Sequence, residues 1–155
     1  IKLAGVPAED VMTPNPVVLS VPEYMTVKEF FAKGELSYSR IPVWRDNRDC
    51  IVGYVLKSTI LELLAKDSFN TVMKNIMRPV LSFDEDTSVF QIWEKMIEKK
   101  EHISILIDRY GCFRGIVTME DVIETMLGRE IVDEADTAAD MQAVAIEKYK
   151  ARLKK

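Results

Sequence analysis

The sequence is poor in the residue types that build metal centres and nucleophilic active sites. It has one histidine, His102, and two cysteines, Cys50 and Cys112, which are too far apart for a Cys-x-x-Cys motif. Zinc sites and catalytic triads combine several ligands, or a nucleophile with a base, so both kinds of site are disfavoured. Two cysteines do not make a disulfide framework either, and we expect a reducing compartment.

Long apolar runs and an excess of positive charge are also missing. No stretch approaches the roughly 18–20 apolar residues that cross a bilayer, and the formal net charge of the 155 residues is −4. A nucleic-acid partner requires a basic face that neutralises phosphate, so we expect no nucleic acid. The N-terminal residues lack the pattern of a signal peptide. Because the chain begins with Ile1 rather than Met, we expect a piece of a longer protein.

What the chain does contain is one pattern written twice, with an offset of 62 positions from Thr26 to Ser88. The matching stretches are Thr26–Phe31 with Ser88–Trp93, Ser39–Val43 with Glu101–Ile105, Cys50–Gly53 with Cys112–Gly115, and Ile60–Leu61 with Val122–Ile123. A Met-x-Pro precedes each half, as Met12-Thr13-Pro14 and Met77-Arg78-Pro79. So many matches in the same order indicate an internal duplication of one structural unit.

Each copy has the local signals of a β-α-β-β-α unit. Thr26 with Glu29, and Ser88 with Gln91, match the capping box at the start of a helix. The strands expected from the apolar runs are Arg40–Trp44, Ile51–Leu56, His102–Ile107 and Phe113–Val117, with a turn at Asp108–Gly111 between the last two. The closing helices are expected at Lys57–Ala65 and Met119–Leu127, and the second should end at Gly128.

These units predict an α+β fold of two β-α-β-β-α repeats related by a pseudo-twofold axis, with their sheets facing across a shared core. Repeat 1 is expected over residues 9–66 and repeat 2 over residues 74–129. Residues 130–155 make an acidic and then basic tail, which we expect to be partly helical with a solvated basic end; contact with anionic lipid is the alternative. Cys50 and Cys112 precede strands at equivalent points, where we expect them to pack as small apolar residues.

Thr118 and Asp121, in the stretch Gly115–Glu124, allow two interpretations. A threonine at a helix start with an acidic residue three positions on can simply cap that helix. The same junction between a strand and a helix N-terminus also offers free amides and the positive end of the helix dipole to a phosphate. The Asp121 carboxylate would then accept hydrogen bonds from a ribose diol. The residues alone leave both interpretations open.

The stretches VMTP, YSRIPVW and GIVTMEDVIE, arranged in two such units, resemble a tandem pair of cystathionine-β-synthase (CBS) domains, or Bateman module. With the trailing GREIVDEAD they are most similar to the CorC/CNNM (cyclin M, haemolysin-like) group of magnesium and cobalt transport proteins, over residues 9–136. The resemblance implies a cytoplasmic module attached to the membrane domain of an inner-membrane or plasma-membrane protein. It also implies a homodimer and a bound adenosine nucleotide such as ATP or AMP, and leaves open whether magnesium accompanies it.

The resemblance further implies a set of binding residues drawn from both repeats. These are Thr13 near the adenine, Tyr38 and Pro42 beside the base or sugar, Arg40 at the phosphates, and Thr118 and Asp121 from the second repeat. The first repeat has Leu56 and Thr59 at the positions of Thr118 and Asp121. Neither side chain offers the same contacts, so we expect one nucleotide per chain and an empty or weak site in the first repeat.

The leading functional hypothesis is a non-catalytic regulatory module that senses an adenosine nucleotide and controls a membrane magnesium or cobalt transporter. One alternative is a structural dimerisation module without a ligand. Another is a CBS pair that regulates a different host protein. An enzyme such as a nucleotide hydrolase is disfavoured, because the sequence has no P-loop, no metal-ligand cluster and no nucleophile beside a base.

Overall fold

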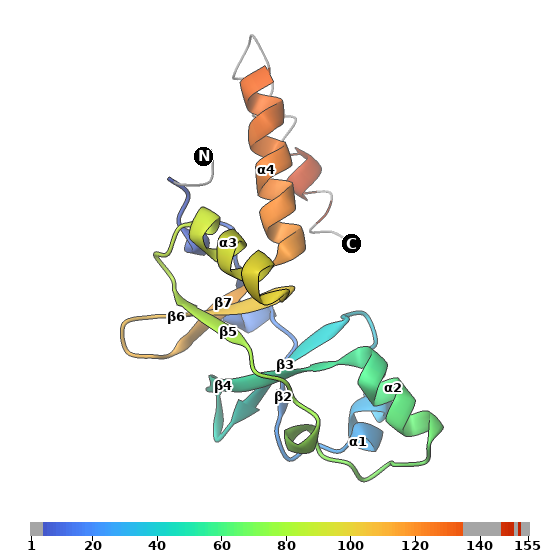
Figure 1. The fold of residues 1–155 in the computed structure, drawn as a ribbon. Helices are drawn as coiled ribbons and strands as arrows, with labels where there is room; N and C mark the ends of the chain where they lie inside the picture. Colours follow the sequence, from blue (N-terminus) through green and yellow to red (C-terminus); the bar gives the residue numbers. More distant parts are fainter. Residues whose placement is uncertain (1–4, 135–146, 151, 153–155) are drawn as a thin grey trace.

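The computed structural model describes residues 5–134, 147–150 and 152 (Figure 1). The first repeat consists of β2 (Val21–Pro22), α1 (Val27–Ala32), β3 (Arg40–Arg45), β4 (Asn47–Leu56) and α2 (Lys57–Ala65). The second consists of β5 (Leu81–Asp84), α3 (Val89–Lys99), β6 (Ile103–Ile107), β7 (Phe113–Thr118) and α4 (Met119–Glu134). A short strand β1 (Thr13–Pro14) and 3-10 helices at Ala8–Asp10, Asn15–Val17 and Met73–Asn75 precede or join them. The predicted α+β fold of two β-α-β-β-α units is confirmed.

Each repeat builds its sheet in the same way. In the first repeat, β2 runs parallel to β3, and β3 pairs antiparallel with β4. In the second, β5 runs parallel to β6, and β6 pairs antiparallel with β7. The strand orders are β2-β3-β4 and β1-β7-β6-β5, and β4 contacts β7 between the two sheets. The shared topology is the structural counterpart of the duplicated sequence.

The segment that leads into each repeat pairs with the sheet of the other repeat. β1, which contains Thr13, lies antiparallel to β7, and Arg78 forms an isolated antiparallel bridge with Tyr54 of β4. Two glycines permit this close approach of the backbones. A Cβ on Gly53 would lie 2.7 Å from the Arg78 carbonyl oxygen, and one on Gly115 would collide with the Thr13 carbonyl oxygen. The repeats are therefore joined by a reciprocal exchange of their leading segments.

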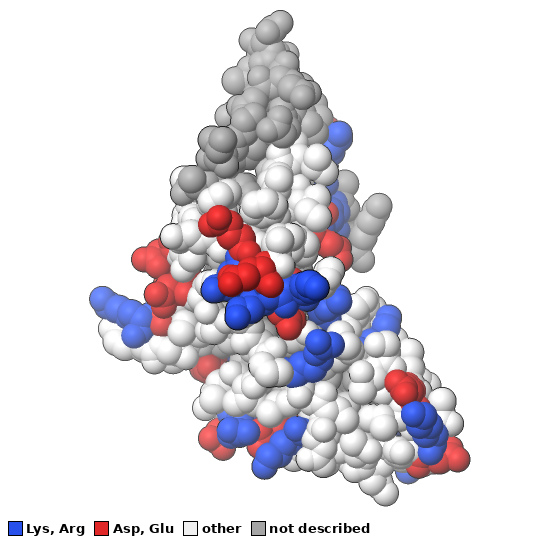
Figure 2. All heavy atoms as spheres, viewed as in Figure 1, with Lys and Arg blue, Asp and Glu red and all other residues white. Residues whose placement is uncertain are grey.

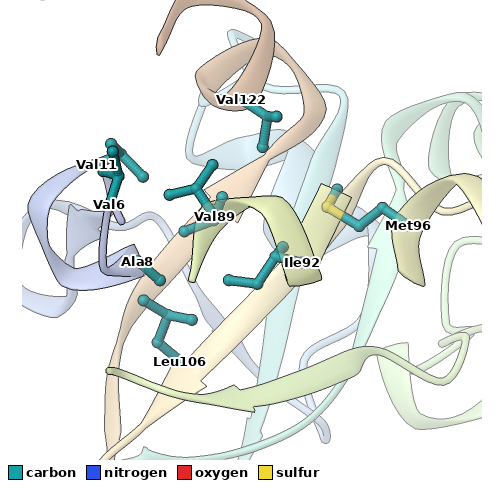
Figure 3. Close-up of a cluster of buried hydrophobic side chains, with 9 residues drawn as sticks. Val6, Ala8, Val11, Val89, Ile92, Met96, Leu106 and Val122 are labelled. Carbon is teal, nitrogen blue, oxygen red and sulfur yellow. The ribbon is translucent and has the colours of Figure 1, made fainter. Parts of the chain in front are cut away.

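Each repeat also has a core of its own. The second-repeat core, drawn in Figure 3, consists of Val6, Ala8, Val11, Val89, Ile92, Met96, Leu106, Val117 and Val122. The first-repeat core consists of Val21, Met25, Val27, Phe30, Ile41, Val43, Val55, Ile60 and Met73. The cluster between the sheets is small and is built around Val18, Ile105 and Phe113. We expected one shared core between the sheets, and this expectation is wrong for most of the buried apolar side chains. In each repeat, these side chains pack between the sheet and the helices of that repeat.

The exchange of leading segments extends into these cores. Val6, Ala8 and Val11 come before β2 of the first repeat in sequence but pack in the second-repeat core. Met73 comes before β5 of the second repeat but is completely buried in the first-repeat core. Neither core is complete without the leading segment of the other repeat, so the two repeats are expected to unfold as one cooperative unit.

The helix starts agree with the capping prediction, whereas one helix end does not. Thr26 Oγ1 accepts the Glu29 amide at 3.1 Å and the Glu29 carboxylate accepts the Thr26 amide at 3.0 Å, which completes a capping box. Ser88 Oγ accepts the Gln91 amide at 3.2 Å. The prediction that the last helix ends at Gly128 is wrong, because α4 continues beyond it. A glycine inside a helix costs only about 0.5–1 kcal/mol relative to alanine, so by itself it does not end one.

Both cysteines are exposed, so the prediction that they pack as small apolar residues is also wrong. Cys50 lies near the turn of the β3–β4 hairpin, where residues 45–50 are all exposed. Cys112 lies in the turn of the β6–β7 hairpin, where residues 109–112 are exposed. The hairpins extend beyond the cores, and the apolar pattern of a strand does not reveal where that extension begins.

Charged side chains of both signs are mixed on the face of the molecule in Figure 2. Ion pairs among the described residues include Arg45 with Glu23 and Arg114 with Glu85, each at 2.8 Å. The net charge of −4 is therefore not gathered into one large acidic area on this face.

Candidate functional site

The junction between β7 and α4 is closed by reciprocal hydrogen bonds. Thr118 is the last residue of β7 and directly precedes α4. Its Oγ1 accepts a hydrogen bond from the Asp121 amide at 3.2 Å, and Asp121 Oδ2 accepts one from the Thr118 amide at 2.8 Å. The two residues therefore do cap the helix, as one interpretation of the sequence held. The same arrangement places a hydroxyl and a carboxylate at the positive end of a 16-residue helix.

The other carboxylate oxygen of Asp121 is held by an arginine from the C-terminal segment, which lies beside α4 (Figure 1). Arg152 Nη1 donates to Asp121 Oδ1 at 2.9 Å, and Arg152 Nε pairs with Glu124 on the next turn of the helix. With these neighbours in place, the Asp121 side chain is only 7% exposed. The expectation of a solvated basic end is therefore wrong for Arg152.

The ion pair is reflected in the acidity of the arginine. Burial lowers the pKa of the Arg152 guanidinium, but the hydrogen bond and the charge of Asp121, together with Glu124 and Glu120, outweigh that effect. The net result is a pKa above the ordinary value for arginine. Arg152 is thus a permanently charged partner for Asp121.

β1 brings a third predicted residue to this junction. Thr13 lies opposite Ile116 on β7, and Ile116 is two residues before Thr118. Thr13 is half-buried. We refer to Thr13, Thr118 and Asp121, with the amides at the start of α4, as the α4 site. Half of the six predicted binding residues are therefore on adjoining elements.

The remaining predicted residues lie around the start of β3 in the first repeat. Arg40 is the first residue of that strand and is half-buried, and Pro42 is buried. Tyr38, in the preceding loop, is 54% exposed. Within the described residues, none of the hydrogen bonds or ion pairs joins these three side chains to the α4 site. Their approach to a common ligand is thus a proposal.

The corresponding junction of the first repeat, between β4 and α2, is built from different side chains. Leu56 is the N-cap of α2 and provides no side-chain hydrogen bond, and Thr59 follows three positions later. The Tyr54 side chain is 2% exposed and its hydroxyl donates to Glu101 Oε2 at 2.7 Å. The guanidinium of Arg78 lies 5.9 Å from the centre of the Tyr54 ring. We refer to these five residues as the α2 site. In this site, Tyr54 of the first repeat contacts Glu101 and Arg78 of the second repeat.

This environment changes the acidity of Tyr54. Burial raises the pKa of the phenol, and the hydrogen bond and negative charge of Glu101 raise it further, whereas Arg78 and Arg40 act in the opposite direction. Because the net shift is upward, the phenol remains protonated at neutral pH and continues to donate to Glu101. The hydroxyl is therefore a stable part of the contact between the repeats.

Other features of the described residues lie apart from the predicted site. Within residues 5–134, 147–150 and 152, no group of three His, Cys, Asp or Glu side chains is arranged to hold a metal ion. The helices in the same residues are too short or too polar to cross a bilayer. A cavity of about 310 Å³ lies between β4 and the second-repeat sheet, with Cys50, Val80 and Ile105 in its wall. None of the six predicted binding residues lines that cavity.

Two features of these junctions were not expected from the sequence. The first is the contact of Arg152 with Asp121, which joins residues 31 positions apart. The second is the hydrogen bond of Tyr54 with Glu101, which joins residues 47 positions apart. The only advance signal was the tyrosine itself, since the matching residue of the second repeat is the aliphatic Ile116.

Comparison with known proteins agrees with the duplicated architecture. Residues 8–66 and 73–128 each match the model of the CBS domain family. The chain is 33% identical over 139 residues to Hemolysin C of Brachyspira hyodysenteriae, which covers 88% of this chain and 50% of that protein. It is 30% identical over 114 residues to the magnesium and cobalt efflux protein CorC of Buchnera aphidicola, covering 74% of this chain and 39% of that protein. The chain thus spans half or less of the length of these relatives.

The fold is similar to a solved structure described as the CBS domain of the bacterial CNNM/CorC family Mg²⁺ transporter in complex with ATP. The TM-score is 0.77 at 28% sequence identity, and the match covers 82% of this chain and 91% of that chain. Two matches to one family model, two sheets of the same topology and relatives of this kind agree with one another. The chain belongs to the CBS domain family, as a tandem pair of the type found in the CorC/CNNM group.

Proposed function

We propose that the chain is a non-catalytic regulatory module that binds one adenosine nucleotide at the α4 site. The observation that carries this proposal is the difference between the two junctions. Of these two helices, α4 begins with a hydroxyl and a carboxylate, whereas α2 begins with Leu56 and lacks a side-chain cap. The similar CBS domain solved in complex with ATP supports adenosine nucleotides as the ligand class.

In the proposed complex, each side chain has a distinct task. Asp121 accepts hydrogen bonds from the ribose diol, as carboxylates do in other nucleotide sites. Thr118 and the amides at the start of α4 bind phosphate oxygens, because the helix N-terminus carries partial positive charge. Arg40 supplies a guanidinium for the phosphates. Thr13 lies near the adenine, and Tyr38 and Pro42 border the base or sugar.

For the parent protein, we propose that this module lies in the cytoplasm, attached to a membrane domain that transports magnesium or cobalt. The relative named a magnesium and cobalt efflux protein supports this assignment. Within the chain, we propose CBS repeats at residues 9–66 and 74–129 and a C-terminal tail at 130–155. Residues 135–146, 151 and 153–155 of that tail lie outside the described residues.

We also propose that the module is a homodimer. Large apolar side chains are exposed on the helices of the second repeat, including Ile97 at 55%, Ile123 at 46% and Leu127 at 57%. Exposed apolar groups gathered on neighbouring helices are typical of protein–protein contacts. Light scattering at micromolar concentrations tests this directly, and a monomeric mass would contradict it.

Isothermal titration with ATP and adenosine tests the proposed site. Asp121→Ala should weaken the binding of both ligands by about 1–3 kcal/mol, the range for hydrogen bonds to a charged group. The loss should be similar for the two, because both ligands contain the ribose. Arg40→Ala should weaken ATP binding more than adenosine binding, since only ATP brings phosphate charge to the guanidinium.

Thr59→Ala is the matched control, because Thr59 occupies the Asp121 position of the first repeat. It should leave both affinities unchanged. Loss of binding in Thr59→Ala with normal binding in Asp121→Ala would contradict the proposal, because it would indicate that the nucleotide binds at the α2 site. If the wild-type protein binds no nucleotide, the structural dimerisation module becomes the better assignment. Phosphate release from ATP above the buffer background would instead indicate an enzyme.

A further inference from the structure

The carboxylate assigned to the ribose already has a partner within the chain. Asp121 has two oxygens, of which Oδ2 accepts the Thr118 amide at 2.8 Å and Oδ1 accepts the Arg152 guanidinium at 2.9 Å. The first of these bonds belongs to the helix cap and is compatible with a ligand. The second comes from a segment that lies outside both repeats. Oδ1 is therefore the oxygen that a ribose hydroxyl and Arg152 would both use.

Burial makes the two uses exclusive. The Asp121 side chain is 7% exposed when Arg152 is in place, which leaves almost no surface for a ligand to touch. Arg152 also pairs with Glu124, so the guanidinium is held over the first two turns of α4 rather than over Asp121 alone. A ribose can approach Oδ1 only if the guanidinium leaves.

The contact is also of a kind that a ligand can displace. The Arg152 side chain is 29% exposed, so water can hydrate the guanidinium when a ligand takes Oδ1 in its place. The preceding residues 147–150 are helical but exposed, whereas Arg152 itself is half-buried. Among the described residues of this segment, Arg152 is the one that forms hydrogen bonds or ion pairs with α4.

We propose that Arg152 is an internal competitor of the nucleotide, docking the C-terminal segment on Asp121 in the ligand-free protein and leaving when a ribose takes Oδ1. This inference rests on the proposed function of the α4 site and adds its regulation. Nucleotide occupancy would be read out as release of the C-terminal segment. A chain whose segment is docked binds nucleotide only in its undocked fraction, which raises the apparent dissociation constant in proportion.

The test compares adenosine binding by the wild-type chain and by Arg152→Gln, measured by calorimetry. Adenosine is the probe because it carries no phosphate, so loss of a positive charge does not weaken its binding through long-range attraction. If Arg152 competes, Arg152→Gln should bind adenosine about three- to tenfold more tightly, as expected when a mostly docked state is removed. Lys150→Gln, which removes an exposed charge from the same segment, should leave the affinity unchanged.

The outcomes separate this inference from the proposed function. If the wild type binds adenosine and Arg152→Gln binds it equally or more weakly, the competition is excluded while the α4 site stands. If neither protein binds adenosine, the proposed function fails and this inference fails with it.

A second measurement needs no variant and so does not depend on how Arg152→Gln folds. Hydrogen exchange of the amides in residues 147–150 should accelerate when adenosine is added to the wild-type chain, because the segment loses its anchor. Unchanged or slower exchange at saturating adenosine would overturn the proposal. It would mean that Arg152 stays in place or moves to the ligand.

Discussion

The two strand-to-helix junctions of this molecule have the same arrangement of strand and helix, but their side chains differ in chemistry. At the α4 site, Thr118 and Asp121 cap the helix and place polar groups at its positive end. At the α2 site, Leu56 makes no cap, and Tyr54 is buried against Glu101 of the other repeat. A duplicated fold therefore does not imply a duplicated function. The positions that differ are those where a ligand would meet side chains rather than backbone.

The difference also assigns a separate use to each junction. The α2 site connects the repeats through the Tyr54 hydroxyl and the Arg78 guanidinium. The α4 site instead contacts the C-terminal segment through Arg152. One junction thus makes contacts within the pair of repeats, and the other contacts a segment that lies outside both repeats.

The largest expected effect concerns the glycines on which the leading segments rest. Gly115→Ala and Gly53→Ala each place a Cβ against a backbone carbonyl, of Thr13 and Arg78 respectively. We expect each to lower the free energy of unfolding by about 1–3 kcal/mol, the usual cost of overpacking. Only Gly115→Ala should also weaken adenosine binding, because β1 carries Thr13. Urea denaturation and calorimetry measure the two quantities.

Gly5→Ala is the control for these variants, because among the described residues no atom lies within 4 Å of its added Cβ. It should change neither stability nor binding. Equal losses of adenosine affinity in Gly53→Ala and Gly115→Ala would show that the two junctions do not differ in ligand binding.

A smaller effect is expected from the hydroxyl that joins the repeats at the α2 site. Tyr54→Phe removes the hydrogen bond to Glu101 and should lower the free energy of unfolding by about 1 kcal/mol. Glu101 is half-buried and regains water in the variant, so the full cost of an unsatisfied charge does not apply. Adenosine affinity should be unchanged, as measured by calorimetry; a loss comparable to that of Asp121→Ala would mean that the α2 site takes part in binding.

The acidity of Tyr54 offers a pH-dependent test of the same contact. Its folded-state pKa is raised above 10.0 by burial and then by Glu101. The associated stability is fully present below the pKa of the unfolded chain, about 10, and is lost as pH rises through the folded pKa. Titration of tyrosinate absorbance should therefore show a late phase, at a pH above the ordinary pKa of tyrosine, that belongs to Tyr54. Glu101→Gln should bring that ionisation to lower pH, and persistence of the late phase in Tyr54→Phe would refute its assignment.

The smallest effect separates the helix starts of the two repeats. Thr26→Ala removes a capping box with bonds in both directions, whereas Ser88→Ala removes the single bond from the Gln91 amide. We expect losses of about 1 kcal/mol for the first and about 0.5 kcal/mol for the second, within the range for N-cap replacements. Thermal denaturation followed by circular dichroism can rank them. A larger loss in Ser88→Ala would reverse this part of the comparison.

Most of the fold could be predicted because the local sequence patterns of helix caps and strands occur in both repeats. The bounds of α2 agree with the predicted Lys57–Ala65, and β3 begins at Arg40 as expected. The turn at Asp108–Gly111 forms, with the Gly111 amide donating to the Asp108 carbonyl at 3.0 Å and Gly111 at a φ of 82°. Caps, turns and apolar alternation depend on neighbours a few positions away, so a sequence reveals them.

The features that escaped prediction depend on distant neighbours or on weak local preferences. Arg152 reaches Asp121 across 31 positions, and no periodic pattern connects them. Gly128 lies inside α4 because helix interiors tolerate a glycine when the chain on both sides remains helical. At the α4 site, the sequence correctly located the capping pair. It did not reveal that the Asp121 carboxylate is paired with Arg152 of the same chain.

The exchange of leading segments has a consequence for the origin of the molecule. A chain with a single repeat could place its Met-x-Pro segment only on the sheet of a second copy of itself. Two identical chains would therefore swap these segments about a twofold axis. Joining the two chains makes the swap intramolecular, so that it no longer depends on protein concentration. It also removes the requirement that the two junctions be identical, so that one can lose its side-chain cap while the other keeps it.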